Sequence, residues 1–245
     1  GGFNAEEVKD IEKRALSLGV ASQKTIDETR NYYDKVIKYL VFGNTLKNGT
    51  YPLSVSAERM SQALAAATYA KELNADAVAH GSTGAGNDQV RFDMIIQILH
   101  PGAEIITPIR DKKLSREEEV NYLKGKGIHF SAEKAKYSIN KGLWGTSVGG
   151  KETLNSLGQL PEEAWPTQVT KQGIEEVKLG FKKGELVSVN GKKYEHPVDA
   201  IHALQAVAAP FGIGRDIHVG DTIIGIKGRV GFEAAAPVLI IKAHH

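Results

Sequence analysis

The sequence predicts an α/β fold in two parts, a partial parallel-sheet domain over residues 1–130 and an α+β domain over residues 131–245. Two observations favour this fold. Short apolar segments alternate with amphipathic helical segments in the first part, whereas a hairpin dipeptide and alternating strands mark the second. The composition, with 41% hydrophobic and 24% charged residues among 245, is ordinary for a folded globular chain.

Three helices are predicted first. One runs from Ala5 to Leu18 with Asn4 as N-cap and Gly19 as C-cap, a second covers residues 33–40, and an alanine-rich third covers residues 57–73. The residues expected to face inward are Val8, Ile11, Ala15 and Leu18 in the first helix, and Met60, Leu64 and Ala67 in the third.

A strand, a glycine-rich loop and a helix follow. Residues 75–80 are apolar and lead directly into the loop at residues 81–88, after which a helix begins. Residues 103–109 have the pattern of a second buried strand, and Ser115 with Glu118 forms a capping box for one more helix. Strands that alternate with helices predict a parallel sheet.

The second part has a different character. Apolar residues alternate on both sides of a Lys-Lys-Gly turn between residues 177 and 189, and Asn190-Gly191 is typical of a type I′ hairpin. A helix is expected from Pro197 to about Gly212. Residues 221–242 alternate β-branched residues around glycines, which predicts further strands.

Charge and composition exclude several classes of protein. Lys plus Arg is 31 and Asp plus Glu is 29, a net charge of +2 that is too balanced for a protein held to nucleic acid by phosphate neutralisation. The chain has no cysteine, which excludes disulfides, thiolate metal sites and cysteine nucleophiles. Its longest apolar stretch, Ala234–Ile241, is too short to span a membrane, and the start does not resemble a signal peptide. We therefore expect a cytoplasmic location.

The glycine loop is the first candidate site. A loop between a parallel strand and a helix directs free backbone N–H groups and the helix dipole at one spot, which suits an anion. It matches neither the Walker A sequence nor the dinucleotide fingerprint, because Gln89 stands where the third glycine belongs. A tight turn that merely needs glycine is therefore an open alternative.

Polar residues gather behind these glycines: Thr83, Asn87, Asp88 and Arg91. Asp88 and Arg91 are three residues apart and share one face once the helix has begun. Each also has a structural interpretation, since Asp88 could cap the helix and Arg91 could be a solvated charge.

At this point the sequence resembles a known family. Residues 80–92, HGSTGAGNDQVRF, resemble the signature of the argininosuccinate synthases. Three other segments resemble motifs of that family in the same order, and the resemblance covers essentially the whole chain: YPLSVSAER at residues 51–59, Tyr137-Ser138 with Ser147, and IGIKGR at residues 224–229.

The resemblance implies a Rossmann-like fold of the adenine nucleotide α-hydrolase type, followed by a synthetase domain. It also implies an ATP-dependent ligase of arginine biosynthesis, in which citrulline attacks the α-phosphate of ATP and aspartate then displaces AMP. ATP with Mg²⁺ would be the cofactors, and citrulline and aspartate the small-molecule partners. The full-length protein would be a homotetramer with no nucleic-acid or membrane partner.

The resemblance also implies roles for particular residues. It assigns Gly81 to ATP; Thr83, Asn87 and Asp88 to aspartate; and Tyr51, Ser56, Asn87, Arg91, Ser138 and Ser147 to citrulline. An arginine fork suits a carboxylate and an aspartate suits an ammonium, so the chemistry agrees with these roles. It implies no general base and no metal ligand, because adenylation depends on positioning and charge stabilisation. Without the resemblance, Tyr51 would be interpreted as a packing aromatic and Ser138 and Ser147 as loop hydroxyls.

The sequence also departs from the family. The pyrophosphate loop Ser-Gly-Gly-Leu-Asp-Thr-Ser and the long C-terminal helix have no counterpart in these 245 residues, so we expect an internal fragment that does not ligate its substrates alone. Ala85 stands in place of a common lysine, Gly220 in place of a glutamate that faces the citrulline ammonium, and Phe232 in place of a tyrosine beside it.

The last two changes delete polar groups, which favours an N-acylated citrulline such as N-succinylcitrulline, with Arg229 or Arg215 as partner of the added carboxylate. Alternatively, Gly220 serves a turn at residues 218–221 and Asp221 reaches the ammonium.

The sequence leaves two other functional classes open. Transfer-RNA thiolation enzymes share this nucleotide fold, but the lack of cysteine argues against them. A folded binding module without catalysis is the third interpretation.

Overall fold

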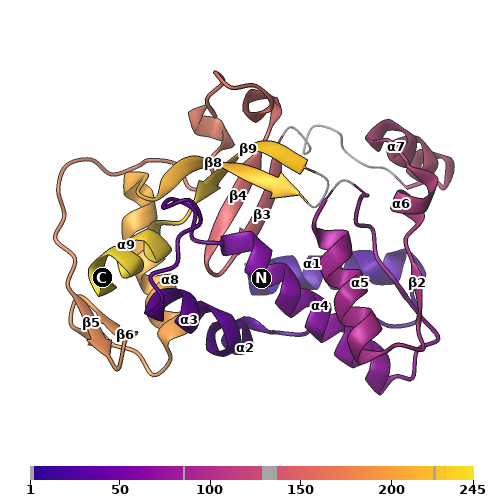
Figure 1. Cartoon of the computed structure of the whole chain (residues 1–245), viewed down its shortest axis with the longest axis horizontal. Helices are drawn as coiled ribbons and strands as arrows, with labels where there is room; N and C mark the ends of the chain where they lie inside the picture. Colours follow the sequence, from indigo (N-terminus) through magenta and orange to yellow (C-terminus); the bar gives the residue numbers. More distant parts are fainter. Residues whose placement is uncertain (1–2, 85, 129–136, 223–224) are drawn as a thin grey trace.

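The structure is a computed structural model that describes residues 3–84, 86–128, 137–222 and 225–245. It is elongated: β1, β2, α6 and α7 lie towards one end, and β5, β6, α8 and α9 lie towards the other (Figure 1). The long helix α4 packs between them against strands of a central antiparallel sheet. The predicted domain boundary near residue 130 lies outside the described residues.

The elements have the following bounds. The helices are α1 (Ala5–Ser17), α2 (Thr29–Tyr32), the π-helical η1 (Tyr33–Ile37), α3 (Lys38–Phe42), α4 (Ser54–Glu72), α5 (Asp88–Leu99), α6 (Pro108–Lys112), α7 (Arg116–Gly125), α8 (Pro197–Ala208) and α9 (Ala235–His244). Among the described residues, short 3-10 turns are η3 (Lys151–Leu154), η4 (Glu162–Ala164) and η5 (Ala209–Phe211). The strands are β1 (Ala77–Ala79), β2 (Glu104–Ile106), β3 (Ser138–Gly142), β4 (Gly145–Gly149), β5 (Leu179–Lys182), β6 (Glu185–Val189), β7 (Lys192–Lys193), β8 (Arg215–Thr222) and β9 (Gly225–Glu233).

The parallel arrangement predicted for the first part is present. β1 pairs in parallel with β2, and the glycine loop connects β1 to α5. The second strand is shorter than predicted because Pro108, which lacks an amide hydrogen and fixes φ, begins α6 at its first position. The expectation that this strand is buried was wrong, since Ile106 is 41% exposed.

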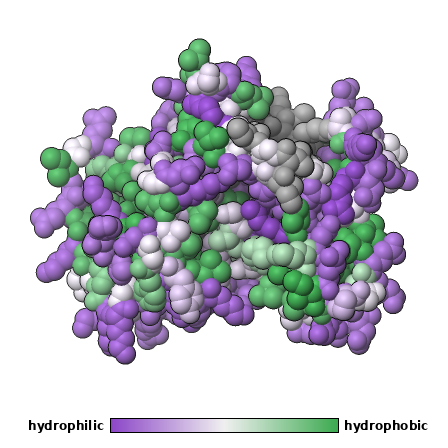
Figure 2. All heavy atoms as spheres, viewed as in Figure 1, coloured by the Kyte–Doolittle hydropathy of each residue, from purple (hydrophilic) through white to green (hydrophobic). Residues whose placement is uncertain are grey.

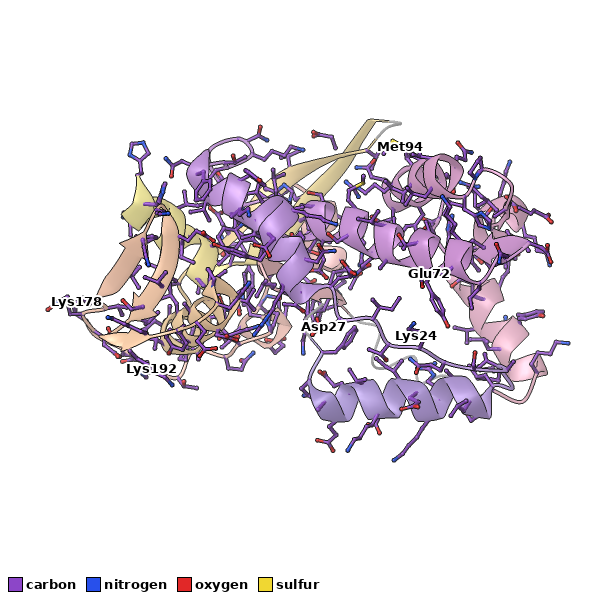
Figure 3. The ribbon with its side chains drawn as sticks, turned by 90° about the horizontal axis from the view of Figure 1, so that it is seen from below. Lys24, Asp27, Glu72, Met94, Lys178 and Lys192 are labelled. Carbon is purple, nitrogen blue, oxygen red and sulfur yellow. The ribbon has the colours of Figure 1, made fainter. Side chains whose placement is uncertain are left out.

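Helix α1 confirms the predicted bounds but not the predicted packing. Asn4 caps it, and the Glu7 carboxylate accepts a hydrogen bond from the Asn4 amide in return, which completes a capping box. However, none of its residues is buried, and Ile11 is 43% exposed. Figure 3 shows α1 set apart from the rest of the molecule, with Lys24 and Asp27 on the segment that connects it. An amphipathic pattern predicts which face of a helix can be buried, but it does not determine whether another element packs against that face.

Helix α4 starts three residues earlier than predicted, at Ser54. Its buried side is formed by small and polar residues, namely Ser54, Glu58, Ser61, Ala63, Ala67 and Ala70. Ala67 is buried as predicted, whereas Met60 and Leu64 are only partly buried. On the neighbouring α5, Val90, Met94 and Ile98 form an exposed apolar stripe, and hydrophobic atoms gather at the lower right of Figure 2, where these helices lie.

The second part is built around an antiparallel sheet in the order β3-β4-β9-β8. The predicted meander is present as β5-β6-β7, and positive φ angles at Asn190 (51°) and Gly191 (81°) fit the type I′ turn. Two predictions were wrong. The turn expected at residues 218–221 is part of β8, with a register irregularity after Gly220. The segment expected to be a strand at the C-terminal end of the chain is helix α9. Most of its residues are apolar, as is typical of a buried helix. Pro237 is tolerated because it lies in the first turn.

The largest hydrophobic core lies in the second part. It contains Trp144, Ile201, Leu204 and Ile240, together with Tyr33 and Ile37 from η1. The Tyr33 hydroxyl also donates to the Glu185 carboxylate at 2.9 Å. Thus η1, early in the chain, packs with elements from late in the chain. Within the described residues, no helix is both long and apolar enough to cross a membrane.

Candidate functional site

A cavity of about 330 Å³ lies where three regions of the chain meet. These regions are the segment that leads into α4, the amino end of α5 and the sheet formed by β3, β4, β8 and β9 (Figure 1). The residues that line it are Lys47, Tyr51, Leu53, Val55, Ser56, Arg59, Gly86, Asn87, Asp88, Arg91, Asn140, Ser147, His218, Gly220, Asp221 and Val230. Polar and charged groups predominate, so the cavity suits a small polar ligand.

Strand register explains why the sheet residues share this cavity. Directly opposed residues in antiparallel strands point to the same face of a sheet. Asn140 lies opposite Ser147, and His218 lies opposite Val230. Alternation along β8 places Gly220 on the same face as His218. This face of the sheet therefore forms one wall of the cavity.

A chain of charged and amide groups crosses the cavity. Arg91 Nη1 donates to Asp88 Oδ1 at 2.8 Å, and Arg59 Nε lies 3.4 Å from Asp88 Oδ2. Arg59 Nη2 donates to Asn140 Oδ1 at 2.6 Å, and Asn140 Nδ2 donates to Ser147 Oγ at 3.4 Å. Two guanidinium groups thus share one carboxylate, and both arginines line the cavity, where a guanidinium suits a ligand carboxylate.

Asp88 does not cap α5. Asn87 is the N-cap residue, neither residue makes a side-chain cap hydrogen bond, and Asp88 is instead paired with the two arginines. The Asn87 amide donates to the main-chain carbonyl of Asp221 at 2.8 Å. The structural interpretation of Asp88 as a cap was therefore wrong, and both residues lie in the cavity wall.

The base of the glycine loop is held by a second polar network. His80 Nε2 lies 2.8 Å from Asp93 Oδ1, and Arg110 Nη1 donates to Asp93 Oδ2 at 2.6 Å. The Ser82 amide donates to His80 Nδ1 at 3.3 Å. Partial burial opposes ionisation of Asp93, but the hydrogen bonds from Arg110 and His80 outweigh it and lower the pKa of Asp93. This network fixes the point where the loop leaves β1.

Tyr51 is both a packing residue and a wall of the cavity. Its ring is stacked on His218 at 4.0 Å between centroids, and Phe232 lies 5.2 Å away on a tilted plane. Its hydroxyl accepts a hydrogen bond from the Val55 amide at 3.0 Å. Phe232 is only 1% exposed and does not line the cavity. The Phe232 side chain therefore packs against Tyr51 without lining the cavity itself.

Most of the predicted site residues come together here. Tyr51, Ser56, Asn87, Asp88, Arg91 and Ser147 line the cavity. Gly81 and Thr83 lie in the glycine loop just outside it, and Ser138 lies opposite Gly149 on the same face of the β3-β4 hairpin, further along the strand. Ala85 and part of the motif at residues 224–229 lie outside the described residues.

Four polar or charged lining residues were not predicted from the sequence: Lys47, Arg59, Asn140 and His218. Periodicity could have found two of them, because Arg59 lies one helical turn after Ser56 and Asn140 lies two strand positions after Ser138. His218 could not be found in this way, since its segment was interpreted as a turn.

The arginines proposed for an acyl carboxylate point away from the cavity. Arg229 lies on the opposite face of the sheet and donates to the carbonyls of Asn155 and Gly158, each at 2.7 Å. Arg215 is on that face as well, where it donates to the Glu162 carboxylate at 2.7 Å. In each strand the arginine alternates with the residues that face the cavity, so its side chain lies on the other face of the sheet. The assignment of these two arginines to an acyl carboxylate was therefore wrong.

Comparison with known proteins gives the relationship of the chain. Residues 2–129 match the family described as "Arginosuccinate synthase N-terminal HUP domain", and residues 137–245 match "Arginosuccinate synthase C-terminal domain". The chain belongs to the argininosuccinate synthase family. The HUP assignment confirms the predicted nucleotide-binding fold of the first part, followed by the synthetase domain.

Curated relatives agree along the whole chain. The argininosuccinate synthase of Methanocaldococcus jannaschii is 41% identical over 99% of this chain, and those of Sulfurisphaera tokodaii and Xanthomonas campestris are each 36% identical over 98% and 100%. The chain spans about 61–62% of the length of these relatives.

Proposed function

We propose that this chain supplies the citrulline and aspartate sites of an ATP-dependent ligase of arginine biosynthesis that forms argininosuccinate. The observation that carries the proposal is the cavity, which is lined by Asn87, Asp88 and Arg91 at the amino end of α5 and by Ser147 from β4. Its volume of about 330 Å³ suits a single amino-acid ligand. The family relationship supports the same reaction.

In this reaction the ureido oxygen of citrulline forms a bond to the α-phosphorus of ATP while the bond to pyrophosphate breaks. The amine of aspartate then forms a bond to the ureido carbon, and AMP leaves. Mg²⁺ is proposed to arrive with ATP, where it would supply positive charge to the phosphates. Among the described residues, no group of three or more His, Cys, Asp or Glu is arranged to hold a metal ion.

Roles follow from the position of each residue. Gly81, at the end of β1, is proposed to contact ATP through its backbone, and Thr83, Asn87 and Asp88 to bind aspartate. Citrulline would be bound by Tyr51, Ser56, Asn87, Arg91, Ser138 and Ser147. The donors at Arg91 and Arg59 suit a carboxylate, and Asp88 suits an ammonium. These groups orient the substrates, and none needs to act as a general base.

A binding experiment tests this proposal. Calorimetric titration of citrulline and of aspartate into the chain should show saturable binding of both. Arg91→Ala should weaken binding of citrulline about tenfold or more, because a charge-assisted contact is lost. Arg30→Ala is the matched control, since Arg30 is 69% exposed and forms only a 4.0 Å ion pair with Asp199. Equal affinities for the two variants would overturn the assignment of Arg91.

We further propose that the ligase accepts an N-acylated citrulline. Gly220 lines the cavity without a side chain, and Phe232 offers no hydroxyl. An acylated nitrogen carries no charge and needs no carboxylate partner at this position. The competing assignment gives the ammonium to Asp221, whose carboxylate lies 2.6 Å from Lys47 Nζ. Competition between citrulline and N-succinylcitrulline in one assay decides between them, and a clear preference for citrulline would overturn the acyl proposal.

Cytoplasmic location and assembly into a homotetramer are proposed on the family resemblance. Sedimentation of the full-length protein tests the tetramer, and fractionation of cells that express it tests the location. A monomer in sedimentation, or recovery of the protein with membranes, would contradict these two proposals.

A further inference from the structure

His218 occupies a position in the cavity that none of the roles above uses. It lies in β8, on the face that lines the cavity, two residues before Gly220. Its ring is half-buried. An imidazole at the wall of a polar cavity can be a flat surface, a hydrogen-bond donor or a hydrogen-bond acceptor.

The ring of His218 is held in a fixed orientation. It is parallel to the Tyr51 ring, with 5° between the planes and 4.0 Å between the centroids, and it meets Phe232 edge-on at 5.9 Å. Tyr51 is itself held by the hydrogen bonds from the Val55 amide and the Ser54 hydroxyl at the start of α4. The stack therefore fixes the plane in which the two ring nitrogens lie.

One hydrogen bond determines which ring nitrogen carries the proton. Nδ1 of His218 lies 3.2 Å from the main-chain oxygen of Val219. A carbonyl oxygen can only accept, so Nδ1 must donate to it. In the neutral ring this leaves Nε2 with a lone pair, and Nε2 is then an acceptor.

The surroundings favour the neutral ring. Burial lowers the pKa of His218, and the ammonium of Lys47 adds to this effect. The hydrogen bond to the Val219 carbonyl and the carboxylates of Asp221 and Asp216 in β8 act in the opposite direction, but burial outweighs them. Tyr51, from the segment before α4, faces the ring through its aromatic face. The net direction is downward from 6.5, so the ring is mainly uncharged at neutral pH.

We propose that His218 is a specificity-determining residue that accepts, at Nε2, a hydrogen bond from an N–H group of the citrulline-type substrate. The inference rests on the proposed function of the cavity. Both a free α-ammonium and an acylated α-amide carry such a group, so the contact does not depend on which citrulline is used. The contact adds a fixed neutral acceptor beside Gly220, where the chain has no side chain of its own.

Two variants separate this role from that of a flat wall. His218→Phe keeps an aromatic ring against Tyr51 but has no acceptor, and His218→Gln carries an amide oxygen near the position of Nε2. Citrulline is titrated by calorimetry into each form at neutral pH, with aspartate as the second probe. We expect His218→Phe to weaken citrulline binding about tenfold and His218→Gln to restore most of it, with aspartate affinity unchanged.

The pH dependence of the wild type gives a second measurement that needs no variant. Protonation of Nε2 removes the acceptor, so citrulline affinity should fall as pH is lowered through the depressed pKa of His218. That fall should be absent in His218→Phe. Two outcomes would overturn the inference while leaving the proposed function intact. One is equal citrulline affinity of the wild type and His218→Phe, and the other is the same fall in affinity at low pH in both. No citrulline binding by the wild type overturns the proposed function and the inference together.

Discussion

The side-chain amide of Asn87 donates a 2.8 Å hydrogen bond to the main-chain carbonyl of Asp221. This bond joins the amino end of α5, which follows the glycine loop, to β8 in the second part of the chain. The carboxylate of the same Asp221 lies 2.6 Å from Lys47 Nζ. Asp221 thus connects three separate segments at one edge of the cavity.

The first prediction concerns this connection. Asn87→Ala should lower the free energy of unfolding by about 1 kcal/mol, since one net hydrogen bond is lost. It should also weaken aspartate binding, because the same amide lines the cavity. Chemical denaturation measures the first effect and calorimetry measures the second. Asn31→Ala, in α2, is the control for the change of residue type. Unchanged aspartate affinity in Asn87→Ala would contradict the prediction.

The second prediction concerns Asp88. Because Asp88 makes no side-chain cap hydrogen bond to α5 and is 41% exposed, Asp88→Asn should change the free energy of unfolding by less than about 1 kcal/mol. Loss of the Asp88 carboxylate should weaken substrate binding about tenfold or more, since this group both orients Arg59 and Arg91 and faces the ligand. A lowered melting temperature with unchanged affinity for both substrates would show a purely structural residue.

The third prediction concerns stability at acid pH. The pKa of Asp93 is lowered in the fold, so its carboxylate binds protons more readily when the chain is unfolded. Its contribution to stability is therefore complete above the ordinary value of 3.8 and is lost as pH falls through the lower folded value. Asp93→Asn should unfold more easily at neutral pH, by about 1–3 kcal/mol, and the difference from wild type should shrink below about pH 4. Urea denaturation at a series of pH values measures this, and a constant difference would contradict it.

The fourth prediction compares two glycines in the left-handed region. Gly191, with φ of 81°, has open space where a Cβ would lie, whereas a Cβ on Gly214, with φ of 75°, would approach the backbone of Ala234 to 2.6 Å. Gly191→Ala should cost about 1 kcal/mol from its backbone conformation alone. Gly214→Ala should cost at least about 2 kcal/mol more because backbone atoms must also move. Equal melting temperatures would contradict this reasoning.

Sequence patterns predict the structure correctly where it is determined by neighbours in the chain. The capping residue Asn4, the capping box of Ser115 and Glu118, and the Asn190-Gly191 turn are local features, and all are present. In the same way, the spacing of Asp88 and Arg91 placed them on one face of α5, where they pair at 2.8 Å. The resemblance supplied Tyr51, Ser56 and Ser147 of the cavity wall, which no local pattern connects.

Sequence patterns give the wrong structure where tertiary contacts determine it. Helix α9 is apolar on every side because α8 and the sheet bury it, and such a segment cannot be distinguished from a strand by periodicity. Gly220 indicated a turn, but in the fold it precedes a register shift within β8. Because the turn prediction was wrong, His218 was not predicted as a site residue, and Arg215 and Arg229 were assigned to the wrong face of the sheet. A change of one position along a strand moves a side chain to the other face.

The fifth prediction follows from that change of face. Arg229 lies on the far side of the sheet, whereas Lys47 lines the cavity together with Gly220 and Asp221. A carboxylate on an acyl group would therefore interact with Lys47, whose Nζ is now paired with Asp221. Lys47→Met should weaken binding of N-succinylcitrulline about tenfold relative to N-acetylcitrulline, which has no second carboxylate.

The matched control for this fifth prediction is Arg229→Met, which removes a cation from the opposite face and should leave the ratio of the two affinities unchanged. Calorimetric competition between the two acylated ligands measures that ratio directly, so that a general loss of folded protein cancels. An equal loss for both ligands in Lys47→Met would show that Lys47 acts only by holding Asp221. A changed ratio in Arg229→Met would show that the far face of the sheet reaches the ligand after all.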